Sequence, residues 1–102
     1  MTLTPSQIEV LARFDGWEIS DKGWYSKNGV TMDNEDAVNW MPTHFTNPAK
    51  LIEMRLKIGK IGQVSKNAAL WSKYFRLGEM ILNKEYTAAA IKTSELIQKL
   101  EA

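Results

Sequence analysis

The dipeptide Asn47-Pro48, near the middle of the chain, is the clearest local structural signal in this sequence. An asparagine side chain can accept a hydrogen bond from first-turn amides, and a proline at the first helical position has no N–H to lose. The pair therefore predicts a helix that begins at Pro48, and Gly59 predicts where it ends. The residues just before it, from Trp40 to Phe45, are predicted to be a loop packed under this helix. The helix residues predicted to face the core are Leu51, Ile52, Leu56 and Ile58.

The amino-terminal part predicts another helix, from Pro5 to about Phe14. Thr4 and Gln7 have the spacing of a capping box, and Pro5 occupies the first helical position. Gly16 can adopt the left-handed conformation that ends a helix.

Three short strands are predicted after this helix. Residues 17–19 and 24–26 are aromatic or β-branched runs, and Asn28-Gly29 is the dipeptide that best fits a tight hairpin turn into residues 30–32. The acidic residues 33–36 that follow are interpreted as a solvated turn or a helix start, and no metal is assigned to them.

The pattern from residue 67 to 84 leaves two alternatives open. Its apolar residues fit a helical period, but residues 71–76 and 80–84 also fit two strands of a hairpin. Gly78 is unfavourable inside a helix by roughly 1 kcal/mol and suits a turn, which favours the hairpin. A last helix through Ala89 and Leu100 is predicted, capped by Thr87 or Asn83. The predicted fold class is α+β, with a small antiparallel sheet and about three helices; a helical second half is the alternative.

Length and composition are those of a single globular domain, residues 1–102. The sequence has no cysteine, which excludes disulfides and thiolate metal sites. It also has no apolar run of the roughly 20 residues that span a bilayer and no signal-peptide pattern. We expect a cytoplasmic protein without a membrane contact.

The sequence does not indicate an enzyme. His44 is the single histidine and is interpreted as a loop residue, and Gly59-Lys60-Ile61-Gly62 does not match a phosphate-binding loop. We assign no catalytic residue, no cofactor and no metal. The four tryptophans are interpreted as core residues, so that Trp24→Ala or Trp71→Ala is expected to lower stability by about 3–5 kcal/mol.

The charges are unevenly distributed. Residues 50–78 carry seven basic residues and one acidic residue, whereas the whole chain has a net charge of +1. These bases are the candidate partner-binding residues of the sequence. They are Lys50, Arg55, Lys57, Lys60, Lys66, Lys73 and Arg76.

Several short motifs occur in a characteristic order along nearly the whole chain. They are Phe14-Asp15-Gly16-Trp17, Gly23-Trp24-Tyr25, the segment 41–47 before a helix, Trp71, Gly78-Glu79 and the alanine-rich run 87–91. In this order the chain resembles the phage ABA sandwich domain family, small proteins of phages and prophages whose activity is largely unassigned. It departs from the family pattern at Pro48 and in a turn, residues 42–45, that is one residue longer. The resemblance implies a sheet between helices, a hairpin at 71–84 and a phage or prophage origin, and it supplies no catalytic residues.

These observations lead to two expectations about function. The first is a non-enzymatic protein-binding module, encoded by a phage or prophage, that inhibits or modifies a host protein such as a defence protein in the bacterial cytoplasm. The alternative is a nucleic-acid-binding accessory protein that uses the basic span 50–76. The sequence does not determine the oligomeric state.

Overall fold

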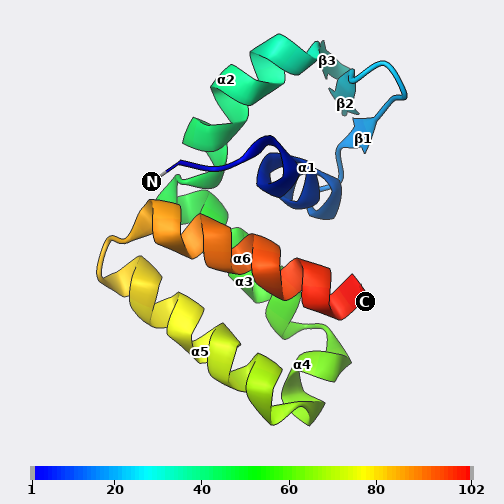
Figure 1. The fold of residues 1–102 in the computed structure, drawn as a ribbon. Coiled ribbons are helices and arrows are strands. Elements are labelled where there is room, and N and C mark those ends of the chain that lie inside the picture. The colour runs from blue at the N-terminus through cyan, green and yellow to red at the C-terminus, as the bar shows by residue number, and fades with distance from the viewer. Residues whose placement is uncertain (1, 102) are drawn as a thin grey trace.

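The computed structural model describes residues 2–101, with all their side chains except that of residue 63. Within this range the chain forms six helices and one three-stranded antiparallel sheet (Figure 1), which confirms the predicted α+β class. In chain order the elements are α1 (Pro5–Phe14), β1 (Glu18–Ile19), β2 (Tyr25–Lys27), β3 (Val30–Met32), α2 (Asn34–Phe45), α3 (Pro48–Gly59), α4 (Gly62–Lys66), α5 (Ala68–Leu82) and α6 (Tyr86–Glu101). Three helices, α2, α4 and α5, are additional to the expected three; α2 and α5 lie in segments predicted to contain a loop and a hairpin.

Helix α1 begins and ends as the sequence predicts. Thr4 and Gln7 form the capping box, with the Gln7 amide donating to Thr4 Oγ1 at 3.2 Å and the Thr4 amide donating to Gln7 Oε1 at 2.9 Å. At the other end Gly16 has φ +101°, and the Trp17 amide donates to the Ala12 carbonyl at 2.9 Å. This is the Schellman arrangement that closes a helix.

The sheet has the order β1-β2-β3 and lies at one end of the molecule beside α1 (Figure 1). Asn28 and Gly29 both have positive φ, 50° and 81°, and connect β2 to β3 as predicted. Tyr25 pairs with Ile19 on one side and with Met32 on the other. Its buried side chain anchors the sheet to the core.

The predicted loop from Trp40 to Phe45 is wrong, because these residues are the second half of α2. Asp33 caps this helix by accepting from the Asp36 amide at 2.8 Å, so the acidic segment is a helix start. Pro42 lies inside the helix, a position that costs about 3 kcal/mol or more. Burial of Ala37, Met41 and Phe45, spaced four residues apart on one face, offsets that cost. The start of α3 at Pro48, with Asn47 as its cap, is confirmed.

The preferred hairpin over residues 71–84 is also wrong, and the helical alternative is correct. Helix α5 is capped by Asn67 and continues through Gly78. A Cβ at Gly78 would lie 2.8 Å from Arg55 Nη2 on α3, and one at Gly59 would lie 2.6 Å from the Tyr74 hydroxyl on α5. These two glycines therefore let α3 and α5 approach closely, and this tertiary contact overrides the low helix propensity of glycine.

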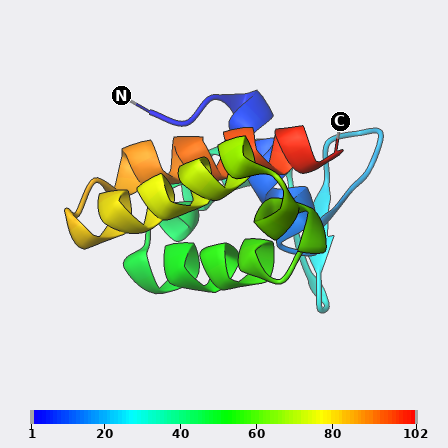
Figure 2. The same cartoon turned by 90° about the horizontal axis from the view of Figure 1, so that it is seen from below.

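Helix α6 is the central element of the helical part. It contacts α1, α3 and α5, and Figure 2 shows α3 running below α5 and α6. Its buried residues are mostly small: Ala89, Ala90, Thr93, Ser94, Leu96 and Ile97. The predicted cap is wrong, since α6 begins at Tyr86 and Asn83 ends α5. Lys84, with φ +61°, makes the turn between these two helices.

The tryptophans divide differently from the prediction. Trp17 is buried, with 7% of its surface exposed, but Trp24, Trp40 and Trp71 are 46%, 44% and 40% exposed. The expected burial of Trp24, Trp40 and Trp71 is therefore wrong. Within residues 2–101, no helix has the length and apolar character needed to cross a bilayer.

The burial of the tryptophans yields a stability prediction. Trp17→Ala should lower the free energy of unfolding by about 3–5 kcal/mol, because it removes a buried aromatic ring. Trp24→Ala, at a half-exposed position, should lower it by about 1 kcal/mol or less. Urea titration of both variants measures the difference, and equal losses would show that the two rings are equally buried.

Candidate protein-interaction surface

The seven candidate bases are distributed over α3, α4, α5 and the turn after α3. Lys50 forms ion pairs with Asp15 and Glu53, Lys57 donates to the Phe14 carbonyl, and Arg76 pairs with Glu79 at 3.1 Å. Arg55 lies over the Tyr74 ring. Lys73 lies beside Lys99, whose ammonium lowers the pKa of Lys73. Lys60 and Lys66 are exposed. Several of the bases thus have roles within the fold, and nothing in the structure tests the prediction that they bind a partner.

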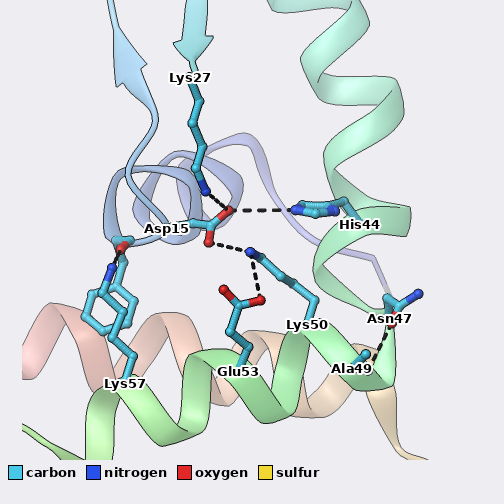
Figure 3. A network of polar contacts seen from close by, with 9 residues as sticks. Asp15, Lys27, His44, Asn47, Ala49, Lys50, Glu53 and Lys57 are labelled. Atoms are coloured by element: carbon cyan, nitrogen blue, oxygen red, sulfur yellow. Dashed lines mark hydrogen bonds and ion pairs between the residues drawn. The ribbon is translucent and has the colours of Figure 1, made fainter. Parts of the chain in front are cut away.

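A buried polar cluster surrounds Asp15 at the end of α1 (Figure 3). The carboxylate of Asp15 lies 2.5 Å from Lys50 Nζ of α3, 3.2 Å from Lys27 Nζ of β2 and 3.7 Å from His44 Nε2 of α2. The Trp40 ring stacks on His44 with 4.4 Å between ring centroids. The cluster therefore joins the end of α1 to β2, α2 and α3.

The pKa directions in this cluster follow from burial and from its charges. Burial alone would raise the pKa of Asp15, but hydrogen bonds from Lys50 and Lys27 outweigh it and hold that pKa below its usual value. Burial also opposes the charge of Lys50, yet Asp15 and Glu53 raise the pKa of this lysine. For His44, burial and then the charge of Lys50 lower the pKa, so its imidazole is neutral at pH 7.

This geometry supports a structural role for the cluster. In a catalytic pair the carboxylate orients the histidine through a hydrogen bond, whereas the 3.7 Å between Asp15 and His44 exceeds hydrogen-bond distance. The charge of Asp15 is instead balanced by two lysines. Among the described residues, no three histidine or acidic side chains come together as metal ligands.

The strongest candidate for a functional surface is an apolar groove between α3 and α5. It has a volume of about 380 Å³. Its lining residues are Ile52, Arg55, Leu56, Phe75, Gly78, Glu79, Ile81 and Leu82. Four large apolar side chains in it are exposed by about half or more: Ile52 (49%), Phe75 (51%), Leu56 (56%) and Leu82 (83%). Trp71 lies beside the groove, with 4.7 Å between the centroids of its ring and the Phe75 ring.

The groove exists because α3 is apolar on two faces. Leu51, Met54 and Ile58 face the core, whereas Ile52 and Leu56 face solvent. The assignment of Ile52 and Leu56 to the core was therefore wrong. The signal was present in the sequence, since five large apolar residues in one short helix exceed what a single stripe requires. From the sequence alone, Asp15 was not identified as a residue that pairs with Lys27 and Lys50.

The comparisons with known proteins do not identify a relative. No family model, no curated protein and no solved structure matches this chain. The resemblance to the phage ABA sandwich domain family stays a prediction from the sequence.

The Asp15 cluster yields a pH-dependent prediction. Asp15→Asn should lower the free energy of unfolding at pH 7 by about 2 kcal/mol, because it removes the charge that two lysines pair with. The folded pKa of Asp15 lies below its unfolded value, so its stabilisation is present above the unfolded pKa and is lost as the pH falls through the folded pKa. Urea titrations between about pH 7 and pH 2 should show a steeper acid loss for the wild type than for the variant.

Glu18→Gln is the matched control, since Glu18 is exposed on β1. Its acid limb should follow that of the wild type. Parallel curves for Asp15→Asn and the wild type would show that the cluster does not stabilise the fold.

Proposed function

We propose that this chain is a non-enzymatic protein-binding module whose contact surface is the groove between α3 and α5. The observation that carries the proposal is the concentration of exposed large apolar side chains on these two neighbouring helices. Contiguous apolar surface of this kind marks interaction sites in small proteins.

The composition of the groove supports a protein partner. Its lining is aliphatic and aromatic, with Arg55 and Glu79 as its charged residues. Large aromatic residues and arginine at the centre of an apolar surface are the usual hot spots of protein interfaces. The groove is also open and lies between two helices. An open groove of this kind fits a protein partner better than a small molecule, which usually binds in a more enclosed pocket.

The class of partner follows from the sequence resemblance. If the chain is a phage or prophage protein, its partner is a protein of the bacterial host. We propose that it inhibits or modifies such a host protein, for example a defence protein, in the host cytoplasm. The exposed groove supports a binding role because the domain can present it without rearrangement.

A pull-down from bacterial lysate tests this proposal. The wild-type chain should retain a stoichiometric protein that Leu56→Asp loses, because a carboxylate in the groove opposes apolar contact. Val30→Asp is the matched control, since Val30 is similarly exposed, at 53%, but lies on β3 away from the groove. Two outcomes would contradict the groove as the contact surface: the wild type and both variants capture the protein equally, or both variants lose it.

Nucleic-acid binding is a second candidate, favoured by one observation. Lys73 of α5 lies beside Lys99 of α6, and the charges of Lys99 and Lys92 lower the pKa of Lys73. Ammonium groups that lie together attract an anion such as a phosphate. The engagement of Lys50, Lys57 and Arg76 within the chain weakens this candidate, because a backbone-binding surface needs several bases available.

A gel-shift series at about 50 and 200 mM salt separates the two candidates. We expect no shift of DNA or RNA at about micromolar protein, a concentration at or below the dissociation constants of most non-specific binding. Binding that weakens steeply with salt and is lost in Lys73→Glu and Lys66→Glu would make nucleic acid the leading function.

A further inference from the structure

We infer that the groove receives a helix of a partner protein that carries a carboxylate beside its aliphatic anchors, and that Arg55 binds this carboxylate. The inference rests on the proposed function and specifies the chemistry of the partner. Arg55 is the basic residue among those that line the groove, and contacts with Tyr74 fix its position there.

Arg55 is held in place before any partner binds. Its Nε donates to the Tyr74 carbonyl at 3.3 Å, and its guanidinium carbon lies 4.1 Å from the centre of the Tyr74 ring. Gly78 leaves the space that the guanidinium occupies, since a Cβ there would lie 2.8 Å from Nη2. A side chain held this way loses little conformational entropy when it binds an anion.

The positive charge of Arg55 has no acidic partner among residues 2–101. None of the ion pairs within this range includes Arg55. Its one hydrogen bond to the part of the chain that the structure describes uses Nε, so neither Nη group has a hydrogen-bond partner there. Glu79, the acidic residue of the groove, is paired with Arg76 at 3.1 Å. A guanidinium with two available Nη groups in an apolar lining matches a carboxylate, which it can bind through two parallel hydrogen bonds.

The lining of the groove comes from two helices, α3 and α5, so a third helix that packs against both is the occupant we infer. The volume of about 380 Å³ is near the lower end for ligand sites and accommodates a few side chains, not a whole helix. A helix lying along α3 and α5 would insert anchors spaced i, i+3 or i+4, and i+7 between Leu56, Phe75 and Leu82. A carboxylate one turn from an anchor would then reach Arg55.

A second copy of this chain fits the groove less well. The carboxylate that a second copy would bring to the same face is that of Glu79, and its own Arg76 already pairs with it. A partner of different sequence supplies a carboxylate without breaking an existing ion pair. The charge pattern therefore favours a different protein.

A selection from displayed helical peptides tests the inference with the full chain. The library holds peptides of about five turns with aliphatic residues at i, i+4 and i+7 and all other positions randomised. Selected peptides that compete with one another and fail to bind Leu56→Asp are groove binders. We expect them to carry Asp or Glu beside the anchors, and replacement of that residue by its amide should weaken binding at least about tenfold.

The variant Arg55→Met isolates the contribution of the guanidinium, because methionine keeps the apolar stem. On this variant the acidic peptide and its amide counterpart should differ by less than about twofold. Arg13→Met is the matched control, since Arg13 is an exposed arginine on α1 that does not line the groove, and it should leave the tenfold difference unchanged. Circular dichroism verifies that each variant is folded.

The possible failures are distinguishable. Groove binders without a preference for an acidic residue would overturn the role of Arg55 and leave the proposed function intact. A lysate protein captured through the groove, with no groove-binding peptide, would overturn the helical occupant alone. If neither the lysate pull-down nor the peptide selection yields a groove binder, both proposals are overturned. A dimer in sedimentation equilibrium that Leu56→Asp dissociates would show that a second copy is the occupant and would overturn the inference.

Discussion

The close approach of α3 and α5 is the constraint on which most of the helical part depends. Gly59 and Gly78 lie where the two helices meet, and each leaves room for a large side chain of the other helix, Tyr74 or Arg55. Larger residues at the two glycines would force the helices apart. The same contact therefore explains why a glycine is tolerated inside α5, why Arg55 has a fixed orientation, and why a groove forms beside it.

A second constraint joins the amino-terminal half to these helices. The sheet and α1 are connected to α2 and α3 through Asp15, which lies between Lys27 and Lys50. A buried carboxylate is costly unless it is paired, and its removal leaves Lys27 without its acidic partner and Lys50 with Glu53 alone. This cluster holds α1 against α3. Asp15 therefore has a structural role, and it does not line the groove.

If the groove binds a partner as proposed, its exposed apolar surface is a compromise between stability and binding. Leu56, Phe75 and Leu82 expose apolar surface that a more stable or more soluble variant would replace by polar residues. Such surface is maintained where a partner covers it. One face of α3 packs in the core and another is exposed in the groove. In the proposal, apolar contact on the exposed face would supply affinity and Arg55 would supply specificity.

The sequence by itself determined the local features whose cause lies within a few residues. The capping box of α1, the Asn28-Gly29 turn and the start of α3 at Pro48 were all predictable, because each depends on hydrogen bonds or backbone angles of neighbouring residues. The α+β class followed from these elements. For the groove, the excess of apolar residues in α3 was also visible before the structure was known.

Only the tertiary structure decided the rest. Residues 68–82 are helical although they contain Gly78, where Arg55 of another helix occupies the space that a side chain would need, and α2 is helical although it contains Pro42, because one of its faces is buried. Which face of α3 is buried depends on where α5 and α6 lie. The pairing of Asp15 with Lys50 joins residues 35 positions apart, and no local pattern encodes such a distance. Contacts between distant segments override local propensity when the free energy gained by burying apolar surface exceeds the free energy of the local preference.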